Sequence, residues 1–122
     1  MEMNSINLVV RFLLEVTALV SMGVWSYGQS DGWVAIVLAI MFPLVAAGIW
    51  GTFNVLNDPS RSGAAPIEVP GWVRLLIELA FFALAASSLY YIGYTKISIF
   101  FAVVVTIHYL ASYQRVLWLL SR

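Results

Sequence analysis

The sequence predicts an all-α polytopic membrane protein with four transmembrane helices, arranged as two antiparallel hairpins. Three observations predict this class. Hydrophobic residues make up 62% of the 122 residues and charged residues only 10%, whereas a soluble domain carries about 25% charged residues. Four apolar stretches are each long enough to cross a bilayer core of roughly 30 Å, which needs about 20 helical residues. One long polar segment divides these stretches into two pairs, so the whole chain is expected to form a single transmembrane domain.

Turn signals separate the four apolar stretches. The links GQSDG (residues 28–32) and YTK (residues 94–96) are short, and short links favour antiparallel helical hairpins. The central segment NVLNDPSRSGAAPIEVPG (residues 54–71) holds three prolines and two glycines, which argues against a helix there. The first ten residues hold one Glu and no Lys or Arg, unlike a secretory signal peptide, so the first stretch is expected to be retained. The four expected spans cover residues 6–27, 32–53, 73–94 and 97–120.

Composition also excludes several classes of function. The formal net charge is zero, so no strongly basic balance points to a nucleic acid partner. The chain has no cysteine, which removes disulfides, thiolate metal sites and cysteine nucleophiles. We find no phosphate-binding glycine loop, nucleophile elbow, paired-His zinc motif or haem-type His pair. We therefore expect no enzyme activity, no metal and no cofactor.

The positions of Lys and Arg predict the orientation of the chain. With four spans, both termini and the central segment lie on one side of the membrane. That side carries five arginines and the other side one lysine, and positive charges accumulate in the cytoplasm. We therefore expect a multi-pass protein of the cell (cytoplasmic) membrane with both termini and the central loop, residues 54–71, inside. The arginines are Arg11, Arg61, Arg74, Arg115 and Arg122, and the lysine is Lys96.

Two similar motifs indicate an internal repeat. RFLLE runs from Arg11 to Glu15, and RLLIE from Arg74 to Glu78. When the sequence is shifted so that the two motifs coincide, the apolar pattern around them coincides as well. Because the first and third spans run in the same direction, the repeat is expected to be a parallel two-plus-two duplication, related by an axis along the membrane normal.

The paired charges of this repeat are the main candidate site. Residues four apart lie on one helix face, and a charge inside a membrane costs at least about 2.5–3.5 kcal/mol, so it faces the protein interior and finds a partner. Acid before base is the better order within one helix, and both motifs have the reverse order. We therefore expect pairing across the first and third spans, Arg11 with Glu78 and Arg74 with Glu15.

Two interpretations of this polar cluster are open. In the first, the four charges hold the two hairpins in register, which the balanced charge favours. In the second, Glu15 or Glu78 exchanges its arginine for a proton or a cationic substrate, as intramembrane carboxylates do in transporters. The position of Glu15 in the first span is similar to that of the essential acid in small multidrug-resistance transporters. The neighbouring Arg11 and the uneven distribution of positive charge argue against that family.

Other polar residues carry weaker predictions. His108, in the middle of the fourth span, is expected to make a hydrogen-bonded helix contact, with ligand binding or proton relay as the alternative. Arg115 is expected to anchor the end of that span or to extend to the lipid headgroups. Asp58 and Glu68, in the central loop, are expected to be solvated.

The stretches INLVVRFLLEVTALVSMGVWSYG, FPLVAAGIWGTF and PGWVRLLIELAFFALAASSLYYIG resemble the YrdB-like family of small bacterial integral membrane proteins. The resemblance covers nearly the whole chain. It implies a four-helix membrane protein, classed as a domain of unknown function, and implies no activity, substrate or cofactor. The residues that carry it are Arg11, Glu15, Trp50, Gly51, Phe53, Pro59, Arg61, Pro70, Arg74 and Glu78.

These positions gather on the side expected to face the cytoplasm. A binding site there would open between the first and third spans under the central loop, with Trp50, Arg61 and Arg115 as candidate contacts. The function expected is that of a non-enzymatic scaffold or accessory subunit, whose partners are the lipid bilayer and a second copy or another membrane protein. The alternative is a small proton- or cation-coupled transporter that uses Glu15 or Glu78.

Overall fold

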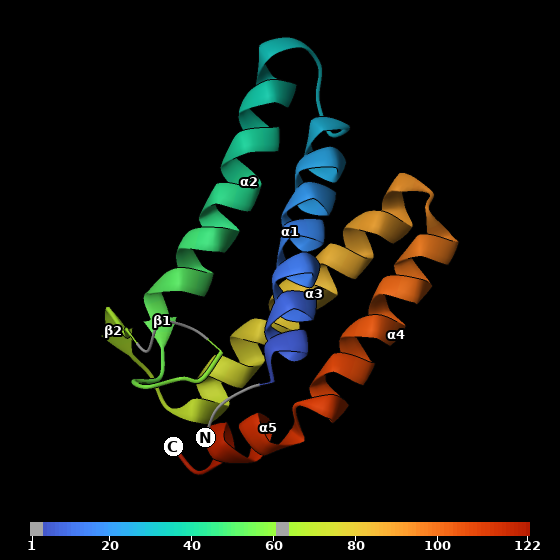
Figure 1. The fold of residues 1–122 in the computed structure, drawn as a ribbon. Helices are drawn as coiled ribbons and strands as arrows, with labels where there is room; N and C mark the ends of the chain where they lie inside the picture. Colours follow the sequence, from blue (N-terminus) through green and yellow to red (C-terminus); the bar gives the residue numbers. More distant parts are fainter. Residues whose placement is uncertain (1–3, 61–63) are drawn as a thin grey trace.

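The computed structural model describes residues 4–60 and 64–122. These residues form five α-helices and one pair of two-residue strands (Figure 1). The first three helices coincide closely with the first three apolar stretches of the sequence, and residues 54–60 and 64–70 of the central segment contain no helix. The elements are α1 (Ser5–Tyr27), α2 (Gly32–Thr52), β1 (Phe53–Asn54), β2 (Ile67–Glu68), α3 (Gly71–Ile92), α4 (Thr95–Ala111) and α5 (Tyr113–Leu120).

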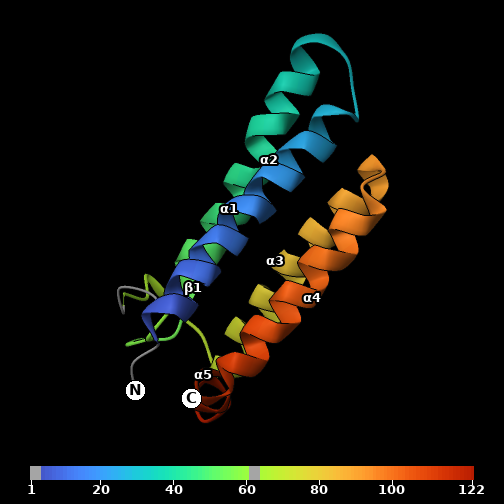
Figure 2. The same cartoon turned by 45° about the vertical axis from the view of Figure 1, so that its right-hand side comes forward.

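The helices are arranged as two pairs. Figure 2 shows the α1–α2 pair and the α3–α4 pair as two layers, with α1 against α3 at their interface. The start of α1, the β1–β2 segment, the start of α3 and α5 all lie at the same end of the molecule (Figure 1). Residues from distant parts of the sequence therefore meet at that end.

Three helices are long and apolar enough to cross a membrane, namely α1, α2 and α3. A fourth candidate exists if α4 and α5 are taken together as one broken span. The fold is thus all-α with three to four candidate spans, which is compatible with a membrane protein. In the most apolar stretch of α2 only 6% of the residues are buried, against 33% in that of α3. The helix α2 therefore presents most of its apolar side chains outward.

The expectation of one helix over residues 97–120 is wrong. The structure has two helices there, which meet at Ser112 with a bend of 71°. The bend lays α5 across the start of α3, where a Cβ at Gly71 would overlap the main-chain carbonyl of Leu119. Only glycine allows this close approach. The bend also turns Arg115 toward the interior.

Local signals explain where α1 begins and where α3 ends. Asn4 caps α1, because its Oδ1 accepts a hydrogen bond of 2.8 Å from the N–H of Ile6. Gly93 ends α3 in the left-handed region, at φ 109°, which glycine adopts without a steric penalty. This conformation lets the N–H of Tyr94 donate to the carbonyl of Leu89 at 3.0 Å. The tight turn into α4 follows directly.

The central segment is ordered by a short parallel pairing of β1 with β2. Phe53 pairs with Ile67 and Asn54 with Glu68, and the N–H of Val69 donates to the carbonyl of Asn54 at 3.0 Å. Asn54 is 1% exposed. The beginning of the segment is therefore packed into the protein, while Glu68 is exposed as predicted.

The apolar core lies between α1, α3 and α4, and Trp50 of α2 completes it. Aromatic rings connect its layers: the ring centroids of Trp50 and Phe81 are 4.5 Å apart, and those of Phe82 and Phe101 are 6.2 Å apart. Aromatic pairs at such separations add about 0.5–1.5 kcal/mol beyond their buried area. The buried apolar residues of this core are Leu14, Ala18, Met22, Trp50, Phe81, Phe82, Ala85, Leu89, Phe101 and Val105.

Candidate functional site

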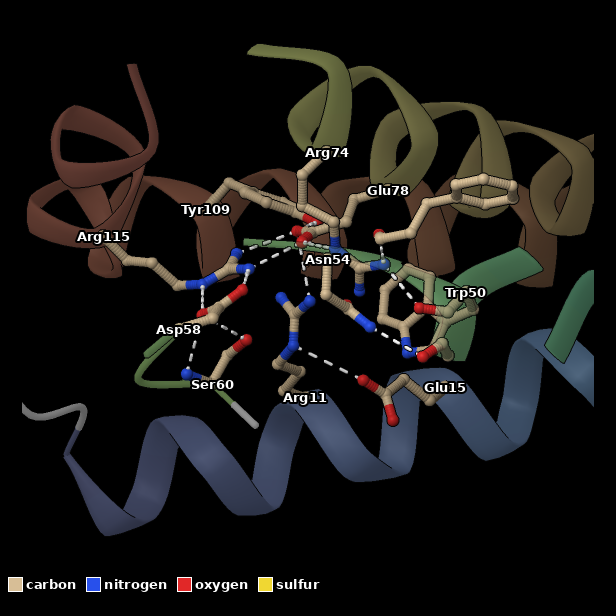
Figure 3. Close-up of polar contacts among 12 residues, drawn as sticks. Arg11, Glu15, Trp50, Asn54, Asp58, Ser60, Arg74, Glu78, Tyr109 and Arg115 are labelled. Atoms are coloured by element: carbon tan, nitrogen blue, oxygen red, sulfur yellow. Dashed lines mark hydrogen bonds and ion pairs between the residues drawn. The ribbon is translucent and has the colours of Figure 1, made fainter. Parts of the chain in front are cut away.

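Six charged side chains meet at the end of the molecule where α5 and the central segment lie (Figure 3). We call them the ionic cluster. They come from α1, from the segment after β1, from α3 and from α5, and they include all four residues of the two sequence motifs. The members are Arg11, Glu15, Asp58, Arg74, Glu78 and Arg115.

Glu78 is the centre of the ionic cluster. Its side chain is 0% exposed, and it interacts with three guanidinium groups. Arg74 Nε donates to Oε2 at 2.8 Å, and Arg11 Nη2 lies 3.1 Å from Oε1. Arg115 donates twice, from Nη1 to Oε1 at 2.8 Å and from Nη2 to Oε2 at 2.6 Å. The hydroxyl of Tyr109 donates to Oε1 at 2.7 Å. One carboxylate therefore contacts side chains from α1, α3, α4 and α5.

Arg115 does not extend to the surface as predicted. It is 1% exposed and binds a second carboxylate, with Nε donating to Asp58 Oδ1 at 2.8 Å and Nη2 to Oδ2 at 2.6 Å. This is the paired geometry in which guanidinium–carboxylate contacts are strongest. The prediction failed because it assumed a straight fourth helix, whereas the bend at Ser112 points Arg115 inward.

Asp58 is likewise not solvated as predicted, since it is 2% exposed. Besides Arg115, its Oδ1 accepts hydrogen bonds of 2.9 Å from the N–H and the hydroxyl of Ser60. The turn formed by Asp58 and Ser60 shapes the loop, and the bond to Arg115 fixes that loop to α5. Asp58 thus ties the central segment into the ionic cluster.

The pair predicted between Arg11 and Glu78 is present in the structure. Arg11 is 2% exposed, and its Nε also lies 3.4 Å from Glu15 Oε1. Glu15 itself is half-buried, with 25% of its side chain exposed. The reciprocal contact between Arg74 and Glu15 stays a prediction.

Trp50 forms an aromatic wall of the ionic cluster. The guanidinium carbon of Arg74 lies 4.5 Å from the centroid of its ring and that of Arg11 lies 5.1 Å away, which is within the range of cation–π attraction. The carbonyls of Trp50 and Phe53 accept hydrogen bonds from Arg74 Nη1. Trp50 is 6% exposed, so it lines the interior here. Arg61, the third candidate contact at this end, lies outside the described residues.

His108 also lies on the inner side of α4, 3% exposed. Its ring is 5.6 Å from that of Tyr109, in an edge-to-face arrangement. Across residues 4–60 and 64–122, neither ring nitrogen has a hydrogen bond partner, so the predicted helix contact through a hydrogen bond is not found there. Those same residues contain no group of three His, Asp or Glu side chains placed to hold a metal ion.

The electrostatics of Asp58 follow from this geometry. Burial acts to raise the pKa of Asp58, but the hydrogen bonds and charge of Arg115, helped by Ser60, outweigh it and hold the pKa below the ordinary value of 3.8. A carboxyl whose pKa is lower in the folded state stabilises the fold above its ordinary pKa. That stabilisation is lost as the pH falls through the lower, folded-state pKa.

The lowered pKa of Asp58 predicts how the stability of the protein depends on pH. The difference in free energy of unfolding between the wild type and Asp58→Asn is expected to be constant above about pH 5. It should shrink as the pH falls below 3.8, because the carboxyl of the unfolded chain then binds a proton while the folded carboxyl, whose pKa is lower, stays ionised. Chemical unfolding in detergent between pH 6 and 3 measures it, with Asp31→Asn, at an exposed aspartate, as the control. A difference that grows toward low pH would contradict the assignment.

The fold and the ionic cluster together define a class: small all-α proteins with three to four candidate membrane spans and a buried group of arginines and acids. The profile of the family described as "Protein of unknown function (DUF2568)" matches residues 9–106. The "Uncharacterized protein YrdB" of Bacillus subtilis (strain 168) is 40% identical over 121 residues, which cover 99% of this chain and 98% of that protein. The chain therefore belongs to this YrdB-like family of unknown function.

No solved structure matches the chain. The matched residues include five members of the ionic cluster and end before Arg115. The sixth member and α5 lie in the part of the chain that the similarity to YrdB covers and the family profile does not.

Proposed function

We propose that the chain is a four-span membrane protein whose ionic cluster holds its helices together at the cytoplasmic side, and that it acts as a non-enzymatic scaffold or accessory subunit. One observation carries the proposal: the carboxylate of Glu78 contacts side chains of α1, α3, α4 and α5. In the membrane, α1, α2 and α3 would be three spans and α4 with α5 the fourth.

The ionic cluster is buried in the interior of the protein. Five of its six members are at most 2% exposed, and the hydrogen bonds of Arg115 and Arg74 to acids measure 2.6–2.8 Å. Removing one partner of such a buried pair leaves an uncompensated charge and typically costs about 3–5 kcal/mol. The cluster therefore favours a fixed arrangement of the helices, as a protein that packs against a partner requires.

The outward apolar surface supports a membrane partner. Most of α2 is exposed, with Ile40 58%, Leu44 60% and Val45 54% accessible. Lipid would cover this surface, and a second copy or another membrane protein would compete with lipid for it. The proposed orientation places α5 and the ionic cluster at the cytoplasmic boundary, because the arginines of α1, α3 and α5 lie at that end and Lys96 lies at the other.

The orientation can be tested by cysteine labelling, because the chain has no cysteine of its own. Asp31→Cys and Lys96→Cys are expected to react with a membrane-impermeant maleimide in intact cells. Glu68→Cys and Arg122→Cys, at exposed positions of the opposite end, are expected to react only after the membrane is opened. The reverse pattern would overturn the orientation, and labelling of all four in intact cells would contradict a single orientation with both termini inside.

The alternative is a proton- or cation-coupled transporter that uses Glu15 or Glu78. The observation in its favour is Glu15, the one acid of the cluster that is partly exposed, with a contact of 3.4 Å to Arg11. Glu78 is less suited, because its two oxygens already meet three arginines and Tyr109.

Flux measurements separate the two functions. In proteoliposomes with a trapped pH dye, the scaffold predicts no proton movement when a cation gradient is applied. Cation-driven proton movement that Glu15→Gln abolishes, with the thermal unfolding midpoint unchanged, would replace the scaffold by the transporter. Glu68→Gln, which removes an exposed acid, is the matched control.

A further inference from the structure

Arg11 is the member of the ionic cluster whose charge is least well compensated. Its side chain is 2% exposed, yet its contacts with acids are 3.1 Å to Glu78 and 3.4 Å to Glu15. None of its three guanidinium nitrogens makes a hydrogen bond of normal geometry to any described residue. Arg115, by contrast, makes four hydrogen bonds of 2.6–2.8 Å to two carboxylates. Buried charges need hydrogen-bonding partners, so the geometry around Arg11 points to a further ligand.

The balance of buried charge indicates the sign of that ligand. All three guanidinium groups of the ionic cluster are at most 2% exposed. Only two of its three carboxylates, those of Glu78 and Asp58, are buried to the same extent, because the side chain of Glu15 is 25% exposed. The six members together carry no net charge, but among those that are at most 2% exposed positive charge exceeds negative charge by one. A ligand with one negative charge would balance it.

Two further side chains, one in α4 and one directly after it, supply hydrogen-bond donors. His108 is 3% and Ser112 is 7% exposed, and in the described part of the chain their ring nitrogens and hydroxyl make no hydrogen bond. The N–H of Ser112 donates to the carbonyl of His108 at 2.9 Å, so the helical spacing continues and both side chains lie on one face. Arg11 lies beside this part of α4, because its Nη2 and the hydroxyl of Tyr109, the residue after His108, approach the same atom, Glu78 Oε1, at 3.1 Å and 2.7 Å. A neutral imidazole offers one N–H and a hydroxyl one O–H.

We propose that Arg11, His108 and Ser112 form a binding site for one small monovalent inorganic anion, such as chloride. The guanidinium group supplies the charge, and the imidazole and the hydroxyl supply hydrogen bonds that strengthen when the acceptor is charged. The burial of all three side chains restricts the ligand to one or a few atoms. The anion would connect α1 to the bend between α4 and α5, a function beyond the scaffold proposed above.

Thermal unfolding of the full-length protein in detergent tests this site. Sodium chloride replaces sodium gluconate at constant ionic strength, so that charge screening stays the same. The midpoint of the wild type is expected to rise with chloride and then level off, as for a ligand that binds only the native state. For Ser112→Ala, the chloride concentration that gives half of the rise should increase about tenfold, as the loss of one hydrogen bond to a charged group predicts.

Matched variants make the result specific. His108→Phe keeps an aromatic ring without a donor and should weaken the chloride effect as Ser112→Ala does. Ser88→Ala removes another buried hydroxyl, which donates to the carbonyl of Leu84 at 2.8 Å. Its unfolding midpoint should depend on chloride as that of the wild type does. Equal unfolding midpoints of the wild type in chloride and gluconate would overturn the proposal. A Ser112→Ala variant whose midpoint depends on chloride as the wild type's does would overturn it as well. If His108→Phe does not fold, Ser112→Ala decides.

Discussion

Replacing Glu78 by Gln is expected to lower the free energy of unfolding by about 3–5 kcal/mol, the typical cost of removing one partner of a buried ion pair. The amide keeps the shape of the side chain but removes the charge that faces Arg11, Arg74 and Arg115. Three buried guanidinium groups then share the remaining acids, and the hydroxyl of Tyr109 donates to a weaker acceptor.

Chemical unfolding of the purified protein in detergent measures this loss. Glu68→Gln is the matched control, because it makes the same chemical change at an exposed position of the central segment. It is expected to change the free energy by less than about 0.5 kcal/mol, as surface substitutions usually do. A Glu78→Gln variant as stable as the wild type would show that the carboxylate is kept for a role other than holding the helices together.

Replacing Arg115 by Met is expected to cost a similar amount, about 3–5 kcal/mol. Methionine fills much of the volume, but Asp58 loses its guanidinium partner and Glu78 loses two hydrogen bonds. Because this arginine joins the central segment to α5, the variant should also loosen that segment. Trypsin, which cleaves after arginine, is expected to cut the chain at Arg61 faster in the variant.

The control for this variant is Arg122→Met, which removes an exposed arginine that lies over the ring of Trp118. Its cleavage rate at Arg61 and its free energy of unfolding should stay close to those of the wild type. Equal cleavage of wild type and Arg115→Met would mean that the bond between Asp58 and α5 does not restrain the segment.

The sequence predicted those features that depend on local pattern. The apolar stretches, the short links and the prolines of the central segment were enough to place α1, α2 and α3 and to predict that residues 55–60 and 64–66, the described residues between β1 and β2, form no helix. The unfavourable order of RFLLE and RLLIE predicted the contact between Arg11 and Glu78, which is present. Each motif also pairs within its own helix, Arg11 with Glu15 and Arg74 with Glu78, which the order did not lead us to expect. The two-plus-two repeat and the four-span arrangement stay predictions.

The features that the sequence did not reveal depend on tertiary contacts. Asp58 and Arg115 are 57 positions apart, and no local rule pairs a loop acid with an arginine near the end of the chain. The bend at Ser112 occurs without a Pro or Gly to mark it. His108, Ser112 and Arg115 have the spacing of one face of a continuous helix, but the helix is broken and bent by 71° at Ser112, so this spacing does not account for the burial of Arg115.

The central claim is that ion pairs to Glu78 hold distant helices together, and a double-mutant cycle between Arg115 and Glu78 tests it most directly. The free energy of unfolding is measured for the wild type, Arg115→Met, Glu78→Gln and the double variant. We predict that the two single losses are not additive and that the double variant is more stable than their sum implies, with a coupling of about 1–3 kcal/mol. Additive losses would contradict the claim, because they would mean that the two side chains contribute independently although they lie 2.6 Å apart.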